Sequence, residues 1–78
     1  MYYVYILRLC DKSFYTGYSG DLKERIKNHQ DDNVQQTKNL RPLKLVYYSA
    51  FESKKKALDF EKYLKTFSGY AFRKKRLL

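Results

Sequence analysis

Two tyrosine-rich stretches and two basic side chains form the part of this sequence that could do chemistry. The stretches are residues 3–7 and 14–18, and the short polar segment 9–13 joins them. Arg25 and His29 follow, four residues apart. A guanidinium can grip a phosphate through two parallel hydrogen bonds, and phenols and an imidazole can move protons. The pattern therefore indicates a site that handles a phosphate backbone.

Nucleic acid is the partner that the overall charge favours. The 78 residues include 17 lysines and arginines against 8 acidic residues, which gives a net charge of +9 and an isoelectric point near 9.7. Such an excess of positive charge attracts anions over a long range. Nucleic acid is the first candidate, and an anionic membrane surface is the second.

Length and cysteine content predict one cytoplasmic domain. A chain of this size has room for one small core, so we expect a single domain over residues 1–78. The single cysteine, Cys10, cannot form an internal disulfide, which is typical of a reducing compartment. The opening apolar run is too short to span a bilayer and lacks the basic segment that starts a signal peptide. We therefore expect a soluble cytoplasmic protein with no membrane partner.

Three strands are predicted to carry the tyrosines. Residues 2–9 and 13–19 are rich in β-branched and aromatic side chains, and the turn between them is short enough to require an antiparallel hairpin. The first strand has apolar residues at successive positions, as in a strand buried on both faces. Gly17 lies inside the second strand, where a close approach by another backbone or a ligand would explain it. Residues 43–50 form the third strand.

Capping residues predict the starts of two helices. Asp21, with Glu24 three residues later, predicts the start of a helix that ends near residue 30. Ser53 similarly begins a second helix, which ends near residue 66. After a break at Ser68 and Gly69, residues 70–78 form a predicted short, strongly basic third helix.

The segment between the first helix and the third strand, residues 31–42, is polar and has no period. We interpret it as a mobile surface loop. The order of elements is then β-β-α-β-α-α, which predicts an α/β fold, an α+β sandwich with one pair of layers.

The first helix brings Arg25 and His29 to its sheet-facing side. At about 100° per residue, Arg25 and His29 lie within about 60° of Leu22 on a helical projection. A cation and an imidazole held against a tyrosine-rich sheet would make a partly desolvated anion site. Alternatively, Arg25 lays only its aliphatic stem on the core and His29 is an ordinary boundary residue.

The second helix has a carboxylate inside its apolar stripe. Glu61 lies roughly 40° from Ala57 on the projection, beside Phe60 and Leu64. Burial would require that Glu61 coordinate a metal, pair with Arg25 or be reached through a cleft. Alternatively, it forms an exposed pair with Lys65 one turn later.

One carboxylate suits Mg²⁺, or Mn²⁺ in its place, better than zinc, because Mg²⁺ keeps most of its waters and takes substrate phosphate oxygens as ligands. No histidine and cysteine cluster with zinc spacing occurs, and no glycine-rich phosphate loop is present. We expect no organic cofactor.

Basic residues outside this set are either solvated faces or a surface that follows a nucleic-acid backbone. The predicted nucleic-acid-binding side chains are Lys38, Arg41, Lys54, Lys55, Lys65, Arg73, Lys74, Lys75 and Arg76.

An ordered set of these residues resembles the GIY-YIG nuclease superfamily, most closely its small stand-alone, UPF0213-like members. The two half-motifs are Tyr3-Val4-Tyr5 and Tyr15-Thr16-Gly17, and the later members of the set are Arg25, His29 and Glu61. The resemblance covers nearly the whole chain. Two positions differ from the motif that names the family. This chain has Tyr3 where the motif has glycine, and Thr16 where the motif has isoleucine. The polar residue that many members have after the metal-binding helix has no clear equivalent in residues 70–76.

The resemblance implies a small mixed fold with a three-stranded sheet, Mg²⁺-dependent hydrolysis of DNA phosphodiester bonds, and a place in DNA repair or recombination. By position, Tyr5 and Tyr15 would be the motif phenols and Gly17 the motif glycine. Arg25 would be the phosphate clamp, His29 a proton-relay or positioning group, and Glu61 the metal ligand. The sequence leaves open which tyrosine is the base, and whether the domain cleaves nucleic acid or only binds it.

Overall fold

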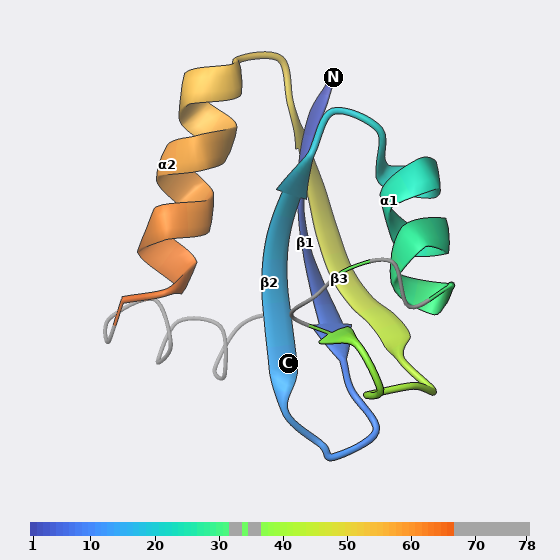
Figure 1. Cartoon of the computed structure of the whole chain (residues 1–78). Helices are drawn as coiled ribbons and strands as arrows, with labels where there is room; N and C mark the ends of the chain where they lie inside the picture. Colours follow the sequence, from blue (N-terminus) through green and yellow to red (C-terminus); the bar gives the residue numbers. More distant parts are fainter. Residues whose placement is uncertain (32–33, 35–36, 67–78) are drawn as a thin grey trace.

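The computed structural model describes residues 1–31, 34 and 37–66, and contains a three-stranded antiparallel sheet with a helix on each face (Figure 1). The strands are β1 (Tyr2–Arg8), β2 (Phe14–Ser19) and β3 (Lys44–Phe51), in the spatial order β2-β1-β3. The helices are α1 (Leu22–Gln30) and α2 (Lys54–Leu64). The predicted strands, hairpin and first two helices are confirmed. The predicted helix at 70–78 lies outside the described residues.

The central strand β1 is buried on both faces, as its apolar sequence predicted. Val4, Tyr5, Ile6 and Leu7 have no exposed surface. Side chains alternate along a strand, so Val4 and Ile6 lie on one face of the sheet while Tyr5 and Leu7 lie on the other. Each face therefore needs its own cover.

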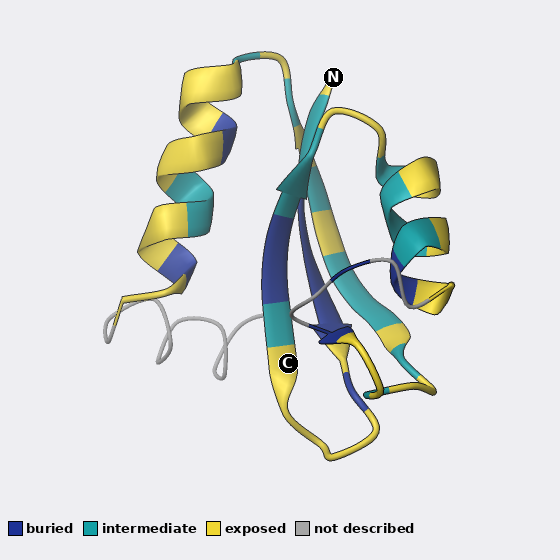
Figure 2. Cartoon of the chain, in the orientation of Figure 1, coloured by how far each residue is buried: buried dark blue, intermediate teal, exposed yellow. Residues whose placement is uncertain are grey.

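The two helices provide that cover from opposite sides (Figures 1 and 2). Ala57 and Leu64 of α2 complete a buried cluster with Val4 and Ile6. On the other face, Leu22 and Ile26 of α1 pack against the cluster formed by Tyr5, Leu7 and Leu9. The result is three layers rather than the expected single pair, because a strand with two apolar faces cannot leave one of them in water.

Both helices begin at the predicted caps. The Asp21 carboxylate accepts a hydrogen bond from the Glu24 amide at 3.1 Å, and the Ser53 hydroxyl accepts one from the Lys56 amide at 3.3 Å. Each satisfies an amide that the first turn leaves without a partner inside the helix. The caps fix where α1 starts, and so fix the direction in which Arg25 and His29 point.

The prediction of a mobile surface loop over residues 31–42 was wrong in part. Thr37 is fully buried, Val34 is only 4% exposed, and Leu40 packs against the cluster that contains Tyr5. Backbone hydrogen bonds from Thr37 to Val34 and from Leu40 to Thr37 hold a compact turn. The buried side chain of His29 lies beneath this turn and requires a polar partner, which Thr37 provides.

Within residues 1–31, 34 and 37–66, neither helix has the length and apolar composition that crossing a bilayer requires.

Candidate active site

Tyr5 lies at the centre of the candidate site because a glycine lies opposite it in the neighbouring strand. Tyr5 pairs with Gly17 across β1 and β2. A Cβ atom at Gly17 would overlap Cζ and Oη of Tyr5, and would come within 2.9 Å of the Tyr15 ring. The close approach expected at Gly17 is thus made by a phenol ring rather than by a backbone or a ligand. Gly17 lets the Tyr5 side chain lie across β2.

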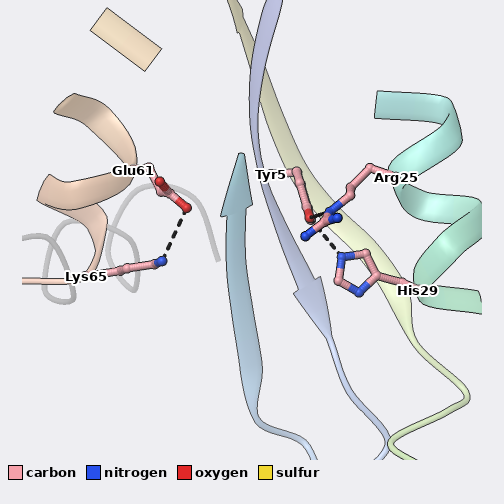
Figure 3. Close-up of polar contacts among 5 residues, drawn as sticks. All are labelled: Tyr5, Arg25, His29, Glu61 and Lys65. Atoms are coloured by element: carbon pink, nitrogen blue, oxygen red, sulfur yellow. Dashed lines mark hydrogen bonds and ion pairs between the residues drawn. The ribbon is translucent and has the colours of Figure 1, made fainter. Parts of the chain in front are cut away.

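The Tyr5 hydroxyl is shared by the two basic side chains of α1 (Figure 3). Its oxygen lies 2.8 Å from Nε2 of His29 and accepts a hydrogen bond from Nε of Arg25 at 3.3 Å. The other ring nitrogen of His29, Nδ1, lies 2.8 Å from the Thr37 hydroxyl, which donates to the Val34 carbonyl at 3.5 Å. Four side chains and one carbonyl therefore form a continuous chain of hydrogen bonds.

Burial fixes the direction of the protons in this chain. Burial, with the nearby charge of Arg25, lowers the pKa of His29 from 6.5 to about 4, so the imidazole is neutral at pH 7 and has one donor and one acceptor nitrogen. Burial also raises the pKa of Tyr5 to about 12, so the phenol keeps its proton. We infer that Tyr5 donates to Nε2 and that Nδ1–H donates to Thr37. Every polar atom then has a partner with the correct polarity.

Tyr15 joins the same cluster from β2. Its ring centroid lies 6.3 Å from that of Tyr5 and 5.1 Å from that of His29, and the side chain is half-buried. The pKa of Arg25 is raised above its usual range, mainly by the hydrogen bond with Tyr5 and to a lesser extent by Tyr15. The structure therefore brings together Tyr5, Tyr15, Arg25 and His29.

Glu61 does not join this hydrogen-bonded group. It lies on α2, across β2 from the cluster in Figure 3, and its Oε2 is 3.2 Å from Nζ of Lys65. Glu61 therefore pairs with Lys65 and not with Arg25. Its side chain is nevertheless only 19% exposed, and its negative charge is the smallest of the causes that raise the pKa of Tyr5. The carboxylate is therefore close enough to Tyr5 to affect its pKa electrostatically.

Comparison with known proteins shows the family of this chain. The sequence model of the GIY-YIG catalytic domain matches residues 1–75. This chain belongs to the GIY-YIG family. It is 44% identical over 66 residues to a UPF0213 protein of Clostridium perfringens, covering 83% of this chain and 71% of that protein. It is also 43% identical over 68 residues to one from Staphylococcus saprophyticus, covering 86% and 83% of the two chains.

A solved structure supports the fold. The solution NMR structure of a UPF0213 protein from Bacillus halodurans superimposes with a TM-score of 0.61 at 38% identity, covering 95% of this chain and 81% of that one. Family membership identifies the chain as a nuclease-type domain. The UPF0213 designation names no substrate, reaction or metal.

The residues of this GIY-YIG domain fit a magnesium ion better than a metal held wholly by protein. Among the described residues, no group of three or more histidine, cysteine, aspartate and glutamate side chains converges. Glu61 lines a surface hollow of about 590 Å³ along α2, together with Asp59 and the lysines Lys54, Lys55 and Lys62. Such a hollow has room for an ion that keeps its waters, and one carboxylate with substrate oxygens suffices for Mg²⁺.

The predicted nucleic-acid-binding side chains have varied surroundings. Lys38 is exposed, Lys55 pairs with Asp59 at 3.3 Å, and Lys65 pairs with Glu61. Arg41 donates a hydrogen bond to the Gln30 carbonyl at 2.8 Å, which satisfies the C-terminal end of α1. Arg73, Lys74, Lys75 and Arg76 lie outside the described residues.

Thr37 is the site residue that sequence reasoning missed. It lies in a polar segment without period, where a threonine looks like any other solvated loop residue. The available signal was indirect. A histidine on the buried side of a helix needs partners for both ring nitrogens, and the nearby apolar residues Val34 and Leu40 could have indicated that this segment folds back onto the core.

Proposed function

We propose that this protein hydrolyses phosphodiester bonds of DNA with Mg²⁺, or Mn²⁺ in its place, bound through Glu61. The observation that carries the proposal is the Tyr5 hydroxyl, which contacts both the imidazole of His29 and the guanidinium of Arg25. The phenol donates to one partner and accepts from the other, and these partners are a neutral imidazole that can accept a proton and a guanidinium with a fixed positive charge. Two basic groups on one buried phenol are the arrangement expected where a proton moves beside an anion.

Arg25 binds the phosphate that is attacked. Its Nε contacts Tyr5, and the side chain is only half-buried, so the guanidinium can meet a ligand at the surface. A guanidinium has five N–H donors in a planar fork that matches two phosphate oxygens. Negative charge develops on those oxygens in the transition state, and a fixed cation stabilises it.

Tyr5 and His29 move the proton of the attacking water. Tyr5 has no exposed surface in the free domain, so the water would reach its oxygen when Arg25 leaves the Tyr5 hydroxyl to bind the phosphate. As the water's proton passes to the Tyr5 oxygen, the proton of Tyr5 would pass to Nε2 of His29 across the 2.8 Å hydrogen bond. The low pKa of His29 opposes this transfer in the free protein. A bound phosphate would offset the charge of Arg25, which is one cause of the low value, and would make the imidazole a better acceptor.

Tyr15 and Glu61 complete the proposed site. Tyr15 is half-buried beside His29 and Arg25, where its hydroxyl can orient the phosphate or the water. Glu61 would hold the metal ion once Lys65 turns outward and releases the carboxylate. The metal, when bound, would supply positive charge for the leaving 3′ oxygen.

A cleavage assay with matched variants tests the proposal. The full chain is incubated with supercoiled plasmid DNA in Mg²⁺ or in EDTA, and nicked products are quantified on a gel. We expect cleavage only with the metal, and none by Glu61→Ala, although Glu61→Ala should bind DNA nearly as well as the unchanged protein. Cleavage that survives in Glu61→Ala would show that Glu61 does not hold an essential metal.

One observation favours a second function, a nucleic-acid-binding module without turnover. Glu61 already has an ion-pair partner, and no group of three or more metal-ligating side chains forms around it among the described residues. This alternative predicts salt-sensitive binding of DNA or RNA and no cutting at any protein or metal concentration. A cytoplasmic location and a role in DNA repair or recombination remain predictions under either function.

A further inference from the structure

A groove on the far side of α1 from Arg25 has no part in the proposed chemistry. It has a volume of about 700 Å³, which is within the range of small-ligand sites. Its floor is formed by Tyr3 and Tyr48 of the sheet with Leu45, and its wall is the flank of α1 that carries Lys23 and Lys27. Figure 1 shows α1 standing beside β3, the edge strand that contributes Tyr48.

We propose that this groove binds an unpaired nucleotide of a single DNA strand, with the base on the tyrosines and the phosphate at the lysines. The proposal rests on the proposed function, because it assigns a part of the substrate to a second place on the same domain. It adds a preference for single-stranded over duplex DNA that the cluster around Tyr5 does not by itself imply.

The tyrosines of the groove offer an aromatic surface that the core does not use. Tyr48 is 54% exposed, although it lies in a strand and faces the same side of the sheet as Tyr5, its partner in the register. Its ring centroid lies 6.4 Å from that of Tyr3, with an interplanar angle of 57°. With 54% of its surface exposed, Tyr48 can contact a flat ligand. Base stacking on such a ring is tolerant of sequence.

Charge complementarity selects a nucleotide over an apolar ligand. Lys23 and Lys27 are exposed and lie four residues apart, so both ammonium groups rise from the same flank of α1. The negative charge at the groove is Asp21, whose carboxylate caps the helix at one end. The phosphate would therefore lie along the lysines and away from the cap, with the base over Tyr48.

The helix separates this groove from the catalytic cluster. On α1, Lys23, Lys27 and Gln30 occupy one flank and Arg25 and His29 occupy the other, with Leu22 and Ile26 between them against the sheet. An α-helix with its side chains is about 10 Å wide. A strand that crosses α1 could place one phosphate at Arg25 and an unpaired neighbour in the groove.

The test measures binding without cleavage. A fluorescein-labelled single-stranded DNA oligomer and the matching duplex are titrated with the full chain in EDTA, and fluorescence anisotropy gives both dissociation constants. Since base stacking on an aromatic side chain contributes about 1–3 kcal/mol, Tyr48→Ala should weaken single-strand binding by about tenfold or more. Duplex binding should change by less than about twofold, because paired bases are not available to stack on Tyr48. Tyr48→Phe should behave like the unchanged protein.

Two further variants complete the test. Lys27→Gln should weaken binding and reduce the slope of log affinity against log salt by about one. Tyr63→Ala, which truncates an exposed tyrosine on α2, is the matched control and should leave the single-strand preference unchanged. Equal losses for single strand and duplex in Tyr48→Ala, or no loss at all, would overturn the proposal. Failure of the proposed function would appear separately, as an absence of metal-dependent cleavage by the unchanged protein.

Discussion

The two faces of the sheet have the same kind of cover but different contents. Both are closed by an amphipathic helix over an apolar cluster. On the α2 face the buried cluster is Val4, Ile6, Ala57 and Leu64, the buried polar side chain is Thr16, and the ion pairs of the helix lie at its surface. On the α1 face, fully buried Tyr5, His29 and Thr37 are connected by hydrogen bonds. One face stabilises the fold, and the other combines stability with the candidate site.

This difference shows under which condition a small domain can bury a polar network without losing stability. A buried histidine is costly unless both ring nitrogens have partners. The α1 face meets that requirement with groups from β1 and from the turn that contains Thr37. The network is therefore part of the core as well as part of the site, and substitutions on the two faces should have different consequences.

The largest contrast should come from removing one hydroxyl on each face. Tyr5→Phe removes the group through which the proposed proton transfer runs, so cleavage should fall by about 10²-fold to 10⁴-fold. Tyr18→Phe, at a tyrosine that packs on the α2 face, should leave the rate within about twofold, because it touches neither Arg25 nor His29. Single-turnover cleavage rates in Mg²⁺ measure both. Similar rates for the two variants would remove the functional distinction between the faces.

Acid should destabilise the domain through His29. In the folded protein its pKa is about 4, against an ordinary value of 6.5, so the unfolded chain binds more protons between these values. Its contribution is complete above about pH 6.5 and decreases as the pH falls toward 4. Equilibrium urea unfolding across this range should show a loss of about 3 kcal/mol as an upper figure, since one pKa unit corresponds to about 1.4 kcal/mol.

The groups around His29 do not share this titration. Arg25 stays charged and Tyr5 stays protonated throughout that range. The control is His29→Gln, whose unfolding free energy should lack this component of the decrease. An equal decrease in the His29→Gln protein would assign the acid sensitivity to other groups.

The glycines distinguish a packed position from an open one. Gly17→Ala inserts a methyl group where Tyr5 and Tyr15 already lie, and should destabilise the fold by about 1–3 kcal/mol, as overpacking does. Gly20→Ala is the matched control, because nothing lies within 4 Å of its added Cβ. Urea unfolding midpoints measure the difference. If the two substitutions are equally mild, the Tyr5 ring does not depend on Gly17 for its place.

Substitution of Thr37 should change both the tautomer of His29 and the free energy of unfolding. Thr37→Val leaves the Nδ1–H group of a buried imidazole without an acceptor, which should cost about 1–3 kcal/mol, while Thr37→Ser should restore the contact. The nitrogen chemical shifts of His29, measured by NMR, report the tautomer directly. We expect the Nδ1–H tautomer in the unchanged protein and in Thr37→Ser, and a shifted tautomer population in Thr37→Val. Identical spectra in all three would mean that Thr37 does not orient the ring.

The smallest effect should come from the polar contact on the other face. Lys65→Ala removes an ion pair between a lysine side chain that is 55% exposed and Glu61 one turn away. Such pairs contribute about 0.3–0.5 kcal/mol, so thermal unfolding should change little. A much larger loss would show that the α2 face also relies on a buried polar contact.

Local patterns predicted the elements and half of the site. Capping residues located the starts of α1 and α2, and the helical period brought Arg25 and His29 to the sheet side of α1. The apolar run in β1 predicted a strand buried on both faces. These features depend on neighbours within a few residues, so sequence alone contains them.

The remaining features depend on contacts between distant segments. The period of α2 places Glu61 toward the sheet but does not tell which face of the sheet the helix covers, so its separation from Arg25 could not be read from spacing. Thr37 lies in a segment without period, and its role appears only when that segment meets His29. The overlap of Tyr5 with Gly17 likewise depends on the strand register.

The order in which the chain is synthesised has a consequence for β1. This strand is made first, yet it lies in the middle of the sheet, with β2 on one side and β3 on the other. Tyr5 cannot gain His29 before residue 29 exists, and the ring cannot be oriented before Thr37 follows. On the ribosome, Tyr5 therefore lacks its partners until residue 37 has been made, and a fragment that ends before Thr37 cannot assemble the hydrogen-bonded cluster.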